Sequence, residues 1–375
     1  MGKILFQERH NMCFVKKVKV AQKVKIGIIG CGGMGGYHLG RMSSCGLFDV
    51  IGILDIDPAV KKKADSRGIP FFGSEAELEK FFALPGLQAV LIATPNDVHK
   101  FYAVQAAEHG LAVLCEKPVT LSCADLQEML DAAEKNHTLF SVHQNRRWDQ
   151  DYLCMKKIVA DNMIGSIYKI ESKVAGCNGI PGAWRKVKSQ GGGMIYDWGV
   201  HLMDQILLFD LSPITSVKCT TSYVYQEEVD DGFELEITFK DGLAVTITID
   251  TNCFVKIPRW VVYGMDGTAI INSFNCRDGK VVAVKSRYDK NLKGVQAGNG
   301  FTKTMADRSK STMKISRLPK IEDDGLDLYR NFCKCVLEKT PEKSIITGKQ
   351  LMRVLRLIEY SFESAEKNET IKTDF

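Results

Sequence analysis

The chain has 375 residues, enough for two domains, and its 45% hydrophobic and 25% charged residues are ordinary for a soluble globular protein. Its net charge of +5 is small and its lysines are scattered, so the composition does not indicate a nucleic-acid-binding protein. No apolar run reaches the length of a transmembrane segment, and we expect no membrane association.

Residues 1–23 precede the first predicted strand. This segment is basic but lacks the apolar core and the cleavage site of a signal peptide, so we interpret it as an N-terminal extension. From Val24, five short apolar segments alternate with helical ones; they read KVKIGIIG, DVIGILD, QAVLIATP, AVLCEKP and TLFSVHQ. Apolar strands that alternate with helices are typical of a parallel sheet covered on both faces. Residues 24–145 are therefore predicted to form a doubly wound α/β (Rossmann) domain.

The pattern changes after the fifth predicted strand. One further helix is followed by segments in which polar and apolar residues alternate, among them FELEITFKDGLAVTITID. Alternation indicates half-buried strands, and the pairs Asp241-Gly242 and Asp266-Gly267 are typical of antiparallel hairpins. Residues 146–322 are predicted to form an α+β domain with an open, mostly antiparallel sheet. Two amphipathic helices in residues 323–375 are expected to pack back on the first domain.

A glycine cluster lies where the first predicted strand ends and the first helix begins. It has the spacing G-x-G-x-x-G; the residues are Gly30, Cys31, Gly32, Gly33, Met34 and Gly35. An acidic residue, Asp55, ends the second strand twenty positions further on, as in dinucleotide-binding domains. Such glycines let the backbone approach a pyrophosphate at a helix N-terminus, and the carboxylate accepts hydrogen bonds from the adenosine ribose. The alternative is a glycine-rich turn that binds no ligand.

Two further motifs carry chemically useful side chains. Glu116 and Lys117 lie at the C-terminal end of the predicted strand in AVLCEKP, the edge at which ligands of such sheets bind. A solvent-exposed Glu–Lys pair before a turn proline is the alternative. In GGGMIYDWGVHLMDQ, Asp197 and His201 are four residues apart on one helix face, with Asp204 three further on. A carboxylate beside an imidazole can orient the ring for general-base catalysis. On pattern alone, an Asp–His pair that only stabilises the helix is the preferred interpretation.

The twelve cysteines do not indicate a metal site or a disulfide framework. No two of them have the C-x-x-C spacing of zinc sites, and free cysteine commonly behaves as a small buried hydrophobic residue. A long chain with unpaired cysteines is typical of the reducing cytoplasm. We therefore predict a cytoplasmic protein without a metal.

The glycine turn, Asp55, the segments ATPNDVH and CEKP, and the GGG…D…H motif, in this order, resemble the glucose-fructose oxidoreductase / inositol dehydrogenase (Gfo/Idh/MocA) family. The resemblance implies NAD as cofactor, Lys117 as the catalytic lysine, His201 as the acid/base and Asp197 as its partner. It also implies a bond between Lys117 and Pro118 that is often cis. The residues expected to contact the cofactor, besides the glycine turn and Asp55, are Thr94, Pro95, Asn96, His99, Glu116, Lys117 and Asn145.

The resemblance implies a small-molecule substrate with a ring hydroxyl, namely a sugar, a glycoside or a cyclitol, and a homo-oligomer. The residues assigned to the substrate are Trp148, Asp149, Tyr152, Trp184, Arg185, Asp197 and His201, whereas Trp198 is expected in the core. NAD is expected in preference to NADP, because no arginine follows Asp55. The lysines at 61–63 are expected on the exposed face of the next helix.

Two other functions remain open. Some relatives oxidise a sugar transiently, eliminate the group attached to it and then reduce it again, with no net redox change. A regulatory protein that binds a nucleotide without catalysis is the second alternative. It predicts loss of the catalytic side chains, whereas Lys117, Asp197 and His201 are all present.

Overall fold

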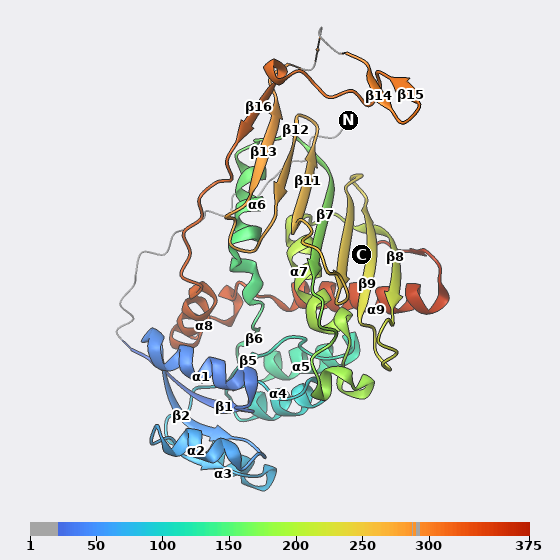
Figure 1. Ribbon diagram of the computed structural model, residues 1–375. Coiled ribbons are helices and arrows are strands. Elements are labelled where there is room, and N and C mark those ends of the chain that lie inside the picture. Colours follow the sequence, from blue (N-terminus) through green and yellow to red (C-terminus); the bar gives the residue numbers. More distant parts are fainter. Residues whose placement is uncertain (1–21, 287, 290–292) are drawn as a thin grey trace.

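The computed structural model describes residues 22–375 except residues 287 and 290–292, so the predicted N-terminal extension falls almost wholly outside it (Figure 1). A six-stranded sheet and a nine-stranded sheet are stacked one above the other along the molecule (Figure 1). A single continuous cluster of buried hydrophobic residues includes side chains from both sheets. The boundaries at residues 145 and 322 therefore stay predictions, because the two predicted domains share a core.

The first sheet confirms the predicted doubly wound fold. Its strand order is β3-β2-β1-β4-β5-β6 and every neighbouring pair is parallel. The strands are β1 (Val24–Ile29), β2 (Phe48–Leu54), β3 (Phe71–Phe72), β4 (Ala89–Ile92), β5 (Ala112–Cys115) and β6 (Phe140–Val142). All four residues of β4 and of β5 are buried, which explains why these strands are apolar throughout. The order reverses between β1 and β4, and ligands bind at such a reversal.

Helices cover both faces of this sheet. They are α1 (Gly33–Cys45), α2 (Ala59–Asp65), α3 (Leu78–Phe82), α4 (His99–Glu108) and α5 (Cys123–Lys135). The N-terminus of α5 shows why a helix begins where it does, since the Ser122 side chain accepts a hydrogen bond from the Asp125 N–H at 3.1 Å.

The second sheet has the order β16-β13-β12-β11-β7-β10-β9-β8-β17, in which only the β7–β10 pair is parallel. The strands are β7 (Ile167–Ala175), β8 (Ile214–Ser222), β9 (Gly232–Phe239), β10 (Ala244–Asp250), β11 (Trp260–Gly264), β12 (Gly267–Ile271), β13 (Gly279–Val284), β16 (Met313–Ser316) and β17 (Ile371–Lys372). The two predicted Asp-Gly hairpins are confirmed as the antiparallel pairs β9–β10 and β11–β12. A separate hairpin of β14 (Val295–Ala297) and β15 (Gly300–Thr302) projects from the far end (Figure 1).

The remaining helices join the two sheets. They are α6 (Gln150–Ala160), α7 (Val200–Phe209), α8 (Asp327–Glu338) and α9 (Gly348–Lys367). Buried residues of α8 belong to the hydrophobic cluster that contains β1 and β2. The other closing helix, α9, lies mainly against β8 and α7 and also contacts α5 of the first domain. The chain then ends in β17, an edge strand of the second sheet.

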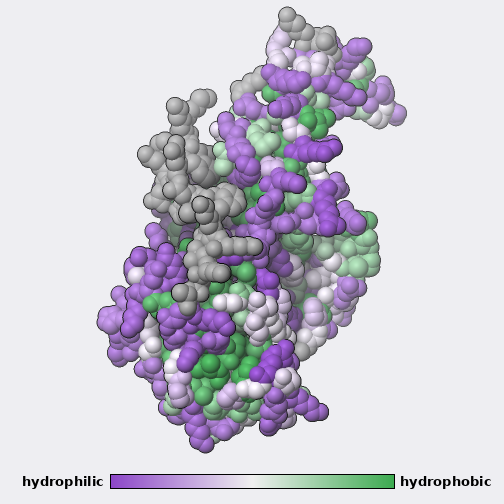
Figure 2. Space-filling view, turned by 90° about the vertical axis from the view of Figure 1, so that its left-hand side faces the viewer, coloured by the Kyte–Doolittle hydropathy of each residue, from purple (hydrophilic) through white to green (hydrophobic). Residues whose placement is uncertain are grey.

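The hydrophobic side chains are unevenly distributed over the surface. On the side shown in Figure 2, hydrophobic side chains gather at the height of the first domain, and most of the upper part is hydrophilic. Within the described part of the chain, no helix combines the length and the hydrophobicity that crossing a membrane requires.

Candidate active site

The glycine turn has the geometry that a dinucleotide requires. A Cβ on Gly35 would lie 1.9 Å from the carbonyl oxygen of Gly30, so only glycine lets α1 pack this close to the end of β1. A Cβ on Gly32 or on Gly33 would meet no atom within 4 Å, so the backbone is open on that side. The hydroxyl oxygen of Thr94, after β4, is buried and has no hydrogen-bond partner among the described residues. These features fit a bound dinucleotide.

Asp55 is fixed at the end of β2 by the backbone around it. Its two carboxylate oxygens accept hydrogen bonds from the N–H groups of Cys31, at 2.6 Å, and of Asp57, at 2.8 Å. A carboxylate has further lone pairs with which to accept ribose hydroxyls. The expectation that residues 61–63 all face away is wrong for Lys63, whose Nζ lies 3.0 Å from the carbonyl oxygen of Cys31 in the glycine turn.

Asp197 lies on a π-helical segment, Ile195–Gly199, that runs directly into α7. Both carboxylate oxygens of Asp197 are engaged by residues from other segments, Oδ1 by Lys117 and Oδ2 by Arg185. No hydrogen bond joins Asp197 to His201 in the described structure. The prediction that Asp197 orients the His201 ring is therefore wrong.

Three consecutive glycines precede this π-helical segment and bring a loop to it. A Cβ on Gly192 would lie 2.5 Å from the carbonyl oxygen of Arg185, so glycine is required for this close approach. The Gly193 N–H donates to the same oxygen at 3.0 Å. Asn96, predicted to contact the cofactor, is buried and donates to the carbonyl oxygens of Gln190 and Gly191. Asn96 thus ties the first domain to the glycine-rich segment.

Lys117 and Asp197 form a largely buried ion pair between the two domains. Lys117 Nζ lies 2.8 Å from Asp197 Oδ1 and 2.7 Å from the Asp197 carbonyl oxygen, and the two side chains are 14% and 11% exposed. Burial alone would raise the pKa of Asp197, but Lys117 and then Arg185 hold that pKa below its usual value. Asp197 is therefore ionised and holds Lys117 in place. The Lys117–Pro118 bond is cis, as the resemblance implied.

His201 is neutral in this environment. It is 5% exposed, and its Nδ1 is buried with no partner among the described residues. Burial, followed by the positive charges of Lys117 and Arg146, holds the pKa of His201 well below its usual value. A neutral imidazole with a free ring nitrogen can accept a proton.

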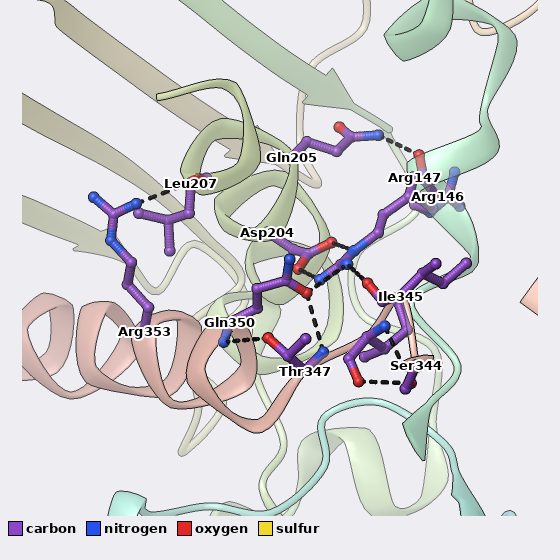
Figure 3. A network of polar contacts seen from close by, with 11 residues as sticks. Arg146, Arg147, Asp204, Gln205, Leu207, Ser344, Ile345, Thr347, Gln350 and Arg353 are labelled. Atoms are coloured by element: carbon purple, nitrogen blue, oxygen red, sulfur yellow. Dashed lines mark hydrogen bonds and ion pairs between the residues drawn. The ribbon is translucent and has the colours of Figure 1, made fainter. Parts of the chain in front are cut away.

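Asp204 also bonds a residue other than His201. Its carboxylate binds the Arg147 guanidinium through two hydrogen bonds, of 2.6 and 2.7 Å (Figure 3). Arg147 further donates to the carbonyl oxygen of Ile345 and to Gln350 Oε1 (Figure 3). Gln350 belongs to the capping box at the start of α9, so this buried network joins α7, α9 and the segment after β6.

Some of the other predicted residues are buried and support the structure, whereas others keep accessible surface. His99 is fully buried, with its ring nitrogens 3.0 Å from the carbonyl oxygens of Thr94 and Pro118, so it supports these loops and has no nitrogen left for the cofactor. Tyr152 is 1% exposed in the core, which contradicts its assignment to the substrate. Trp148 is half-buried against the core.

The remaining predicted residues keep accessible surface. Met34 is exposed on the first turn of α1, and Pro95 and Asn145 are exposed after β4 and β6. Asp149 is half-buried and bonds Arg146 at 2.7 Å. Trp198, expected in the core, is half-buried with the Arg146 guanidinium 4.1 Å above its ring.

A buried cluster around Glu116 was not predicted from the sequence. Glu116 Oε1 lies 2.6 Å from His38 Nε2 and 2.8 Å from His143 Nδ1, and Tyr329 on α8 lies 2.6 Å from His38 Nδ1. Burial would raise the pKa of Glu116, but His143 and His38 hold it well below its usual value. His143 could have been found, because it follows β6 just as Glu116 follows the neighbouring parallel strand β5. Nothing in the sequence pairs Tyr329 with His38.

These three side chains, His38, Glu116 and His143, are close enough together to hold a metal ion. However, two ligands of one zinc ion lie about 3.3 Å apart, given metal–ligand bonds of about 2.0 Å. The 2.6 Å between His38 and Glu116 is instead a hydrogen-bond distance. Glu116 Oε2 also accepts the Lys117 N–H at 3.1 Å, so the cluster supports the strand end that carries Lys117.

Comparisons with known proteins agree with this fold. Residues 24–144 match the model of an oxidoreductase family with an NAD-binding Rossmann fold (GFO_IDH_MocA), and residues 152–270 match a Gfo/Idh/MocA C-terminal domain. An NAD-binding protein from Listeria innocua is 38% identical, with a TM-score of 0.83 over 94% of this chain and 97% of that one.

Two further proteins are similar over most of their length. The scyllo-inositol 2-dehydrogenase (NADP(+)) IolW of Bacillus subtilis (strain 168) is 25% identical over 93% of this chain and 95% of its own. The WlbA dehydrogenase from Bordetella pertussis, solved with NADH and UDP-GlcNAcA, shares the fold at 20% identity and a TM-score of 0.73, over 94% of this chain and 100% of that one. The chain therefore belongs to the Gfo/Idh/MocA family of oxidoreductases and carries that family's NAD-binding Rossmann fold.

Proposed function

We propose that the chain transfers a hydride between nicotinamide and the carbon of a ring secondary hydroxyl in a sugar, a glycoside or a cyclitol. The observation that carries this proposal is the meeting of Lys117, from the first domain, with Asp197 on the segment that leads to His201. A cationic amine near a neutral imidazole is the pair that deprotonation of an alcohol needs. The similarity to an inositol dehydrogenase supports a ring polyol as substrate.

Each side chain has a distinct role in this proposal. When bound, NAD supplies the hydride acceptor. Lys117 donates a hydrogen bond to the substrate oxygen and stabilises the negative charge that develops there, while Asp197 holds the lysine in place. His201 takes the hydroxyl proton on its neutral imidazole ring.

The proposal includes NAD in preference to NADP. Asp55, held at the end of β2, would repel a 2′-phosphate at the ribose it binds. The positive charge of Lys63, which lies at the glycine turn, reduces this repulsion. Titration of both cofactors against the wild type, Asp55→Ala and Lys63→Ala tests it. We expect NAD to bind at least tenfold more tightly to the wild type, and tighter binding of NADP would contradict the preference.

The experiment that tests the function is a substrate panel followed by NADH absorbance. It contains inositols, aldoses and glycosides, with a 2-hydroxy acid and an aromatic dihydrodiol as unrelated alcohols. We expect a ring polyol to be oxidised, and Lys117→Ala and His201→Ala each to lower turnover at least a hundredfold. Oxidation of only the unrelated alcohols would refute the proposal. Cleavage of a glycoside without net NADH would favour transient oxidation with elimination.

We also propose that the protein forms a homo-oligomer through its second sheet. Tyr168 on β7 is 49% exposed and lies beside Tyr263 on β11, with ring centres 6.3 Å apart. Large exposed apolar side chains on a sheet face are typical of a protein interface. Light scattering of the wild type and of Tyr168→Lys measures the mass, and a monomeric wild type would refute the proposal.

A further inference from the structure

Arg185 has hydrogen-bond donors that no described residue uses. Its Nε lies 3.2 Å from Asp197 Oδ2, and its guanidinium carbon lies 4.4 Å from the centre of the Trp184 ring. The two terminal nitrogens of a guanidinium carry four of its five N–H donors. No described residue accepts a hydrogen bond from them, and the side chain is 29% exposed.

The segment that carries Arg185 is held in place by its own contacts. The Arg185 carbonyl oxygen accepts the Gly193 N–H at 3.0 Å, and the next residue, Lys186, pairs with Glu227. Stacking on Trp184 supports the plane of the guanidinium. The unused N–H donors are therefore presented in a fixed position, which lowers the entropic cost of binding a ligand to them.

The carboxylates of the site are already engaged. Asp197 accepts from Lys117 through one oxygen and from Arg185 through the other, and Asp149 accepts from Arg146. The Nε of Arg146 is buried and has no partner among the described residues. The terminal N–H groups of Arg185 are also unused, so a ligand that satisfies them has to supply acceptors.

We propose that the substrate carries an anionic group, a carboxylate or a phosphate, and that Arg185 binds this group through its two terminal nitrogens. A planar guanidinium matches both anions with paired hydrogen bonds. Lys117 and Arg185 hold the same Asp197 carboxylate, so an anion at Arg185 sits beside the hydroxyl that reacts at Lys117. This inference rests on the proposed function, because it concerns the substrate of the same site.

The test measures binding without turnover, from the tryptophan fluorescence of the protein saturated with NADH, which cannot accept a hydride from the probe. The probes are matched pairs: glucose with glucuronate, galactose with galacturonate, and glucose with glucose 6-phosphate. We expect at least one anion to bind tenfold or more tightly than its neutral partner, and the pair involved distinguishes carboxylate from phosphate. Arg185→Gln should abolish this preference. Lys186→Gln removes a neighbouring charge that is already paired and should keep it.

Equal dissociation constants within every pair would overturn the inference. An equal loss of preference in Arg185→Gln and Lys186→Gln would also overturn it, because the total positive charge of the segment would then explain the preference. The failure of the proposed function is a different result. If an anion binds through Arg185 but no panel compound yields NADH or is cleaved, the anion site stands and the function fails. If neutral polyols are oxidised and no anion is preferred, the function stands and the anion site fails.

Discussion

Replacing Asp197 by asparagine tests which residue this carboxylate serves. Asp197 bonds Lys117 and Arg185, and no hydrogen bond joins it to His201 in the described structure. Asp197→Asn keeps the shape of the side chain but leaves two positive charges without their counter-charge. The variant should therefore weaken the attachment of Lys117 to residue 197 and leave the His201 imidazole ring in place.

The magnitude follows from burial and from the contact that remains. Removing one partner of a fully buried ion pair costs about 3–5 kcal/mol. Lys117 keeps its 2.7 Å hydrogen bond to the Asp197 carbonyl oxygen, so we expect Asp197→Asn to lower the free energy of unfolding by about 2 kcal/mol. The exposed pair of Lys157 and Asp161 provides the control, because Asp161→Asn should cost less than about 0.5 kcal/mol.

A double-mutant cycle identifies the partner, with urea unfolding as an assay that needs no substrate. Asp197→Asn combined with Lys117→Met should give a coupling energy of about 1.5 kcal/mol or more, because the two mutations remove the same interaction. Asp197→Asn combined with His201→Asn should be additive within about 0.5 kcal/mol. A larger coupling to His201 than to Lys117 would refute this reasoning and restore Asp197 as the residue that orients the ring.

Three further predictions concern the glycine-rich segment, the helix that follows it and a carboxylate packed against them. Gly192→Ala places a Cβ 2.5 Å from the Arg185 carbonyl oxygen, so it should lower the melting temperature and weaken substrate binding more than NAD binding; equal effects on both would contradict this. Burial raises the pKa of Asp230 to about 7. Between about pH 4 and pH 7, Asp230 therefore keeps its proton in the folded protein but has lost it in the unfolded chain. Wild-type stability should therefore fall by about 2–3 kcal/mol relative to Asp230→Asn between pH 5 and pH 8, and parallel unfolding curves would contradict this. Because the pKa of His201 is held well below its usual value, kcat/KM should stay constant as the pH falls through 6.5, and a loss centred there would contradict a neutral imidazole.

The fold and the location of the site follow from short-range patterns in the sequence. The apolar strands, the Asp-Gly hairpins and the cap at Ser122 involve residues close together in the chain, so their chemistry is visible without a structure. The glycine turn is recognisable for the same reason, because Gly30 and Gly35 touch across one strand–helix junction. Parallel strands then bring the segment after β5, with Glu116 and Lys117, to the same edge of the sheet.

Only the tertiary structure decided which side chains are partners. Lys117 and Asp197 are 80 residues apart, and His38 and Tyr329 are 291 apart, so no spacing rule pairs them. The Asp197–His201 prediction was wrong because Lys117 and Arg185, which come from other segments, engage the two carboxylate oxygens of Asp197. A sequence shows which groups can react, but the packing of distant segments determines which of them meet.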